Sequence, residues 1–107
     1  METIQIGCTN YTQIEAIGIM RHSASHDKTY SLAQQLIAAK LNIACKQTNS
    51  SCIVDAITAA DSFLCTHPVG SGVTANSAAW LSIKATYNLI VTYNTGLLCA
   101  PSCGITQ

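Results

Sequence analysis

The sequence predicts an all-α fold: a four-helix, up-and-down-like bundle with a short extended N-terminal arm, stapled by disulfides. Four segments repeat apolar residues at helical spacing, the primary signal for amphipathic helices. Short connections between successive helices imply antiparallel neighbours. Six cysteines in 107 residues are an even count in a short chain, which indicates disulfides and an oxidising compartment. We expect one domain over residues 1–107, with an arm at 1–10 and a cysteine-pinned tail at 97–107.

The arm and the first helix come at the start of the chain. Residues 3–6 alternate apolar and polar side chains, which suits a short strand or an extended arm. A helix is predicted over 12–22, because Thr12 and Glu15 form a capping-box pattern that satisfies free backbone N–H groups. Gly18 weakens this helix by up to about 1 kcal/mol. The residues at helical spacing are Ile14, Ile17, and Met20 or Arg21.

The second helix is predicted to begin at 28 or 31 and to end at 45. It carries two neighbouring apolar stripes, and so wide an apolar surface indicates a central helix that is buried on more than one side. The first stripe is Leu32, Leu36, Ala39 and Ile43, and the second is Ala33, Ile37 and Leu41.

The third and fourth helices are predicted over 52–66 and 75–95. The third ends at His67, because the residue before Pro68 disfavours helical backbone angles. A plain loop follows. Gly96 is a suitable stop for the fourth helix. Its last β-branched residues would also fit a strand, but the periodicity of the longer window favours a helix.

An up-and-down order sorts the cysteines between the two ends of the bundle. One end should hold Cys8, Cys45, Cys52, Cys99 and Cys103, whereas Cys65 lies one helix length away, too far for a disulfide to bridge. Cys45 and Cys52 are the best candidate pair, and Cys8 suits Cys103 or Cys99. Either the predicted topology is wrong and all six pair internally, or Cys65 and a tail cysteine cross-link neighbouring subunits.

The composition excludes several partners. Only 9% of the residues are charged and the formal net charge is zero, against about a quarter charged in typical proteins. There is no basic patch for nucleic acid, and no apolar stretch reaches the about 20 residues that span a bilayer. A surface so poor in charge does little to keep copies apart, so copies of the chain itself are the expected partner.

From Tyr11 onward the chain resembles a known family. The matching segments are Tyr11-Thr12, Ser31-Leu-Ala-Gln-Gln-Leu-Ile-Ala-Ala-Lys-Leu-Asn-Ile43, Ala59-Ala-Asp61, His67-Pro-Val-Gly-Ser71, Tyr93-Asn-Thr-Gly96 and the cysteine-containing tail. They resemble a domain of secreted and cell-surface bacterial proteins that usually opens with a Gly-Tyr-Trp-Lys-Asn-His motif. That motif is absent here. Divergence or trimming would explain the absence; alternatively, a neighbouring subunit supplies the missing segment. The family implies no established activity and no site residues.

No catalytic, cofactor-binding or metal-binding residues are predicted. His22 and His26 have a spacing that chelates metal on a helix, but they lie across an expected loop and solvated histidines are the alternative. His67 and Cys65 would suit a thiol–imidazole pair, although Pro68 favours a helix terminus instead. The sequence contains no acid pair on one helix face, phosphate-binding loop, nucleophile elbow or Cys-x-x-Cys.

Aromatic residues form the remaining candidate site. Trp80, Tyr87 and Tyr93 are candidates for a binding face. The alternative for Trp80 and Tyr87, which lie at helical spacing, is that they belong to the core. Asn10 and Asn49 begin sequences that fit glycosylation acceptors.

Three functions follow from these observations. The first is a non-enzymatic structural protein of the cell surface or extracellular matrix, as a self-assembling filament or polymer subunit. The second is an extracellular binding module that uses the aromatic patch for a glycan or a protein. The third is a Cys/His metal-binding domain. An extracellular location is expected. No signal peptide is recognised, because Glu2 occupies the place of a basic n-region.

Overall fold

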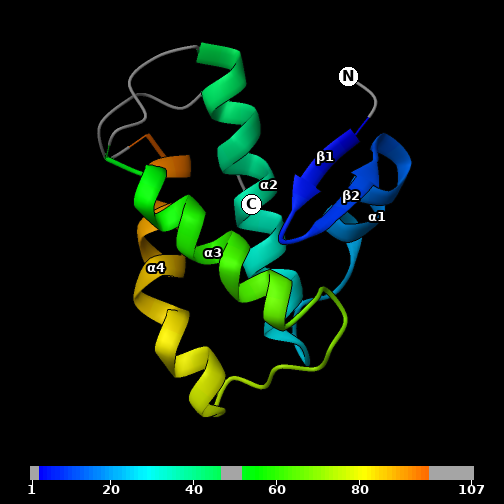
Figure 1. Ribbon diagram of the computed structural model, residues 1–107, viewed down its shortest axis with the longest axis vertical. Helices are drawn as coiled ribbons and strands as arrows, with labels where there is room; N and C mark the ends of the chain where they lie inside the picture. Colours follow the sequence, from blue (N-terminus) through cyan, green and yellow to red (C-terminus); the bar gives the residue numbers. More distant parts are fainter. Residues whose placement is uncertain (1–2, 47–51, 97–107) are drawn as a thin grey trace.

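The computed structural model describes residues 3–46 and 52–96 as four helices and a two-stranded antiparallel sheet (Figure 1). The elements in chain order are β1 (Thr3–Ile6), β2 (Thr9–Thr12), α1 (Gln13–Arg21), α2 (Lys28–Lys46), α3 (Val54–Thr66) and α4 (Ala78–Asn94). The predicted all-α class is therefore wrong: the molecule is mostly helical but mixed, because the expected arm is one half of a β-hairpin.

The hairpin forms because two β-compatible segments flank a two-residue turn. Thr3 pairs with Thr12 and Ile6 with Thr9, so Gly7 and the next residue make the turn. Gly7 has a positive φ of 67°, which two-residue hairpin turns require and which glycine adopts at little steric cost. The pairing satisfies backbone groups that a lone extended arm would leave to solvent.

The local signals that predicted the helices are confirmed. Thr12 and Glu15 form both bonds of the capping box at the start of α1. Helix α3 ends before His67 and Pro68. The stretch of α4 that also suited a strand is helical, as its periodicity predicted. The helix begins after Ser77, later than the predicted residue 75, because the Ser77 hydroxyl accepts the Trp80 backbone N–H.

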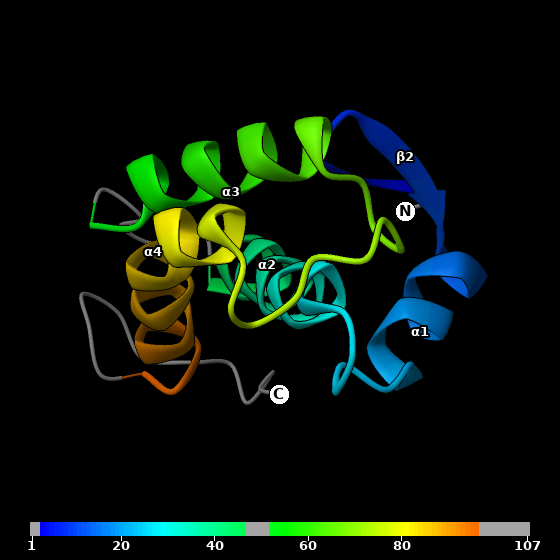
Figure 2. The ribbon, with the colours of Figure 1, turned by 90° about the horizontal axis from the view of Figure 1, so that it is seen from below.

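Helix α2 is the centre of the fold, as its two apolar stripes predicted. Every residue from 31 to 39 is buried, which requires cover on all sides of the helix. The hairpin and α1 lie on one side of α2, and α4 lies on the other (Figures 1 and 2). Leu32, Leu36 and Ile90 are fully buried in the core cluster.

The predicted up-and-down order of the helices is wrong. In Figure 2, which looks nearly along α2, helix α3 lies across α2 rather than beside it. Helix α1 has nine residues against nineteen in α2, so it is too short to flank α2 along its whole length. The hairpin occupies the remaining space on that side, and it contacts α2 and α3.

This arrangement corrects the expected cysteine pairs. Cys8 forms a disulfide with Cys65, with a Cα–Cα distance of 4.8 Å, because the hairpin turn packs against the C-terminal end of α3. Neither the pairing of Cys8 with a tail cysteine nor a Cys65 cross-link between subunits is compatible with this bond. Cys52 is also disulfide-bonded. The side chains of Cys45, Cys99 and Cys103 lie outside the described part of the structure, so the pairing of Cys45 with Cys52 stays a prediction.

Candidate functional site

Three clusters of polar side chains join elements that are distant in the sequence. The first, which we call the hairpin anchor, consists of Gln5, Gly7, Lys40 and Asp61. The Gly7 N–H donates to the Asp61 carboxylate at 2.8 Å, and Lys40 forms an ion pair with Asp61 at 2.9 Å. Lys40 also donates to the Gln5 carbonyl. The anchor thus binds the hairpin to α2 and α3, next to the disulfide.

The second cluster, the amide cluster, is buried between α2 and α4. Asn94 is 1% exposed, and its Nδ2 donates to the carbonyl and the side-chain oxygen of Gln35 at 2.9 and 2.8 Å. Asn42, which is 2% exposed, donates to the Asn94 side-chain oxygen at 3.1 Å. The Asn94 amide thus forms three hydrogen bonds with α2, and together they fix the position of α4 on α2.

The third cluster, the loop clamp, holds the segment between α3 and α4 against the start of α2. The Asp27 carboxylate accepts from the Thr29 hydroxyl at 2.6 Å, the Thr29 N–H at 3.0 Å, the Gly72 N–H at 3.0 Å and the Val73 N–H at 3.2 Å. The buried Thr29 hydroxyl in turn accepts from the Gly70 N–H at 2.9 Å. The segment that the sequence indicated to be a plain loop is therefore bonded along its length.

The loop clamp sets the ionisation of Asp27. Burial by itself would raise the pKa of this carboxyl, but the hydrogen bonds from Thr29, Gly72 and Val73 outweigh it and hold the pKa below its ordinary value. A carboxyl whose pKa is lower in the folded state stabilises the fold above its unfolded pKa. This contribution is lost as the pH falls through the folded value.

Asp27→Asn is expected to lower the free energy of unfolding at pH 7 by about 2 kcal/mol, because an amide offers one acceptor oxygen in place of two. Urea unfolding at several pH values measures this difference. It should shrink as the pH falls below about 4, where the unfolded carboxyl protonates. Asp55→Asn, at an exposed position in the first turn of α3, is the control. A pH-independent difference between wild type and Asp27→Asn would contradict the assigned ionisation.

The structure does not bring the predicted reactive residues together. His22 stacks on Tyr30 with ring centroids 3.8 Å apart, and His67 stacks on Phe63 at 4.5 Å. Cys65 is bonded to Cys8 and offers no free thiol for His67. Within residues 3–46 and 52–96, no three Cys, His, Asp or Glu side chains gather as metal ligands.

The predicted aromatic binding face is not exposed. Trp80 and Tyr93 are each 3% exposed and belong to the core, and Tyr87 is half-buried. Tyr87 packs edge-on against Trp80 with centroids 5.2 Å apart, and the Lys28 ammonium lies 5.7 Å from the Trp80 ring. Burial also raises the pKa of the Tyr93 hydroxyl. The alternative that Trp80 and Tyr87 belong to the core holds for Trp80, and Tyr87 packs against the core while half-buried. The burial of Tyr93 was not predicted.

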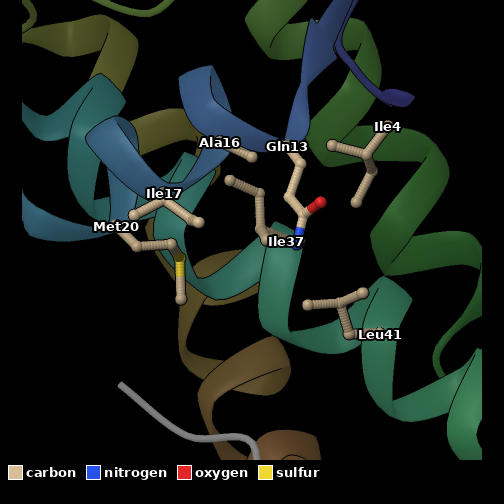
Figure 3. Close-up of a pocket in the computed structure, with 7 residues that line it drawn as sticks. All are labelled: Ile4, Gln13, Ala16, Ile17, Met20, Ile37 and Leu41. Carbon is tan, nitrogen blue, oxygen red and sulfur yellow. The ribbon is translucent and has the colours of Figure 1, made fainter. Parts of the chain in front are cut away.

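An apolar groove of about 330 Å³ lies between α1, α2 and β1 (Figure 3). Its volume is at the small end for ligand pockets. In Figure 3 the Gln13 amide points into the space between Ile4 and Ile37, and it is the single polar side chain among the described lining. The lining residues are Ile4, Gln13, Ala16, Ile17, Met20, Ile37 and Leu41.

Exposed apolar side chains are a feature that sequence reasoning missed. The large ones among the described residues are Ile14, Ile17, Val54, Leu81 and Leu89, exposed by 82, 42, 50, 60 and 38%. In α1 the buried residues are Ala16 and Ile19. Of the expected stripe, Ile14 and Ile17 point outward, while Met20 is half-buried against the core. Ala16 and Ile19 are also at i, i+3 spacing, and this is the sequence signal that α1 could face the core with these two residues instead.

Comparisons of the chain with models of protein families, with curated proteins and with solved structures find no match. The resemblance to a family of secreted bacterial domains stays a prediction. No helix in the described part of the chain combines the length and the apolarity needed to cross a bilayer.

Proposed function

We propose that this chain is a non-enzymatic extracellular structural module that assembles with copies of itself. The observation that carries the proposal is that two helices each expose a pair of large apolar side chains, Ile14 and Ile17 on α1 and Leu81 and Leu89 on α4. Moving such a side chain from full exposure to full burial is worth about 1.5–3 kcal/mol, and these four are still 38 to 82% exposed. In a chain of zero net charge, little electrostatic repulsion opposes that contact.

The positions of the two faces favour a chain of subunits over a closed dimer. Helices α1 and α4 lie on opposite sides of α2 in both ribbon views (Figures 1 and 2). A subunit with one self-complementary face forms a dimer and stops, whereas two such faces on opposite sides allow growth in a line. This supports the filament or polymer form of the proposed function.

The polar residues of the three clusters form bonds within the protein, and this also supports a structural function. Segments that carry the family resemblance contribute Lys40 and Asp61 to the hairpin anchor, and Asn42 and Asn94 to the amide cluster. These residues bond to one another rather than to an open site. The resemblance to secreted and cell-surface domains, together with the disulfides, favours an extracellular location.

We expect native material to contain particles larger than the monomer, with a mass that rises with protein concentration. Sedimentation velocity measures this mass, and electron microscopy should show linear assemblies. Leu81→Asp should shorten these assemblies, because it places a charge in the α4 contact. Thr58→Asp adds the same charge to an exposed position on α3 and should leave assembly unchanged. Dispersed monomers at all concentrations would overturn the proposal.

A binding module is the second candidate, and the groove rather than the aromatic residues favours it. An apolar ligand of small volume would fill the space beside Ala16. Isothermal titration with dodecanoate tests this function, with Leu41→Trp as the variant that fills the groove. Heat of binding that disappears in the variant supports a module, and no heat with the wild-type chain rejects a site for this ligand.

A further inference from the structure

Helix α1 has apolar residues on both of its sides. Ala16 and Ile19 face the core, while Ile14 and Ile17 are exposed to solvent. Gly18 is exposed beside them, and a Cβ built on it would meet no atom within 4 Å. The outward residues are spaced i, i+3 and i+4, which is the spacing of a helix face that packs against another helix.

The charges of α1 indicate what covers this face. The helix has two charged residues, Glu15 in its first turn and Arg21 in its last. In an antiparallel pair of α1 helices, Glu15 of each copy lies near Arg21 of the other, and the helix dipoles oppose each other favourably. A parallel pair would bring like charges together. The face therefore complements itself in one orientation, that of a two-fold axis.

The shape of the same surface agrees with a second copy. The Ile14 side chain is highly exposed and does not line the groove, whereas Ile17 on the same helix lines it together with Leu41. A projection next to a hollow on one surface is what a two-fold contact needs, because each copy offers both. Gly18 adds no side chain, so it permits close approach of the two helices.

We propose that two copies of this chain pack α1 against α1 in antiparallel orientation around a two-fold axis near Ile17 and Gly18. In this contact the Ile14 side chain of each copy enters the groove of the other, and Glu15 pairs with Arg21 across the axis. The inference rests on the proposed self-assembly and names one of its two contacts. The α4 face provides the other.

The Leu81→Asp variant isolates this contact, because it blocks the α4 face. In this background, sedimentation equilibrium should show a concentration-dependent dimer. Adding Ile14→Asp should raise the dimer Kd about 100-fold, since both copies carry the change and each loses a buried isoleucine. Ile14 is 82% exposed in the single chain, so the melting temperature should change little. Adding Thr58→Asp in place of Ile14→Asp is the control, and the dimer should persist.

Gly18→Ala provides a test in which stability and association move in opposite directions. Alanine favours helix over glycine, and the open space around Gly18 accommodates its methyl group. We expect the melting temperature of the dilute single chain to rise by about 4 °C. The dimer Kd should rise about tenfold or more, because two added methyl groups separate the helices at the axis.

The outcomes separate the contact from the function. If wild type assembles but neither Ile14→Asp nor Gly18→Ala weakens the Leu81→Asp dimer, the α1 contact is wrong and self-assembly stands. If wild type is monomeric at every concentration, both are wrong. If Leu81→Asp is monomeric while wild type assembles, α4 is the sole contact and the α1 pairing is overturned.

Discussion

Replacement of Asn94 by aspartate is expected to lower the free energy of unfolding by about 4 kcal/mol at pH 7. The Asn94 amide donates to both oxygens of Gln35 in a site that is 1% exposed. Aspartate is nearly the same size but replaces these two donors with an acceptor. It also places a charge beside Gln35 and Asn42, the neutral partners that the described residues give to Asn94. The charge also lies at the C-terminal end of α4, where the helix dipole disfavours an anion.

Urea unfolding of Asn94→Asp measures this loss, and its pH dependence identifies the cause. Burial raises the pKa of the introduced carboxyl above its unfolded value of about 4, so the penalty sets in as the pH rises from that value. Asn88→Asp makes the same change at an exposed position on α4 and should cost less than about 0.5 kcal/mol. Equal effects of the two variants would show that the amide cluster does not hold α4 on α2.

Gly7→Ala is expected to lower the free energy of unfolding by about 3 kcal/mol or more. A Cβ at Gly7 would lie 2.8 Å from the backbone carbon of Leu64 and 3.0 Å from the backbone nitrogen of Cys65. Backbone atoms of α3 cannot move aside cheaply. The hairpin must therefore shift, and this shift weakens the hydrogen bond from the Gly7 N–H to Asp61. The positive φ adds about 1 kcal/mol for any residue with a Cβ.

Gly72→Ala is the matched control for Gly7→Ala. Gly72 also has a positive φ, of 86°, but a Cβ there would meet nothing within 4 Å. The backbone N–H of Gly72 donates to Asp27, and an alanine at this position keeps that N–H. We expect a loss of about 1 kcal/mol from the backbone conformation alone. The difference between the two variants in chemical denaturation measures the contact between hairpin and helix, and no difference would contradict it.

Local sequence signals predicted the helices well and the first strand only in part. The capping box of Thr12 and Glu15, and the stop at His67 and Pro68, act within a few residues, and they lie where the pattern placed them. The hairpin was missed although Gly7 separates two short runs with strand character. Both runs have four residues, too short for periodicity to distinguish a paired strand from an extended arm.

The arrangement of the helices was beyond local reasoning. An up-and-down order assumed that successive helices lie side by side, and the position assigned to Cys65 followed from it. The ion pair of Lys40 with Asp61, and the bond of Asn42 to Asn94, join positions 21 and 52 residues apart. Nothing in the spacing of these residues indicates that they meet. The exposed face of α1 was missed because both sides of this helix are apolar, so the pattern does not decide which side faces the core.

The burial of α2 on all sides has a consequence for the way the chain folds. The hairpin with α1 and the pair α3 and α4 each pack on α2, and the core cluster draws its residues from all of these elements. Neither half therefore has a nucleus of its own. Amide protons of α2 should exchange with solvent only through global unfolding, more slowly than those of α1. Proteolytic cleavage between α1 and α2 should yield fragments that keep their structure only while they remain associated.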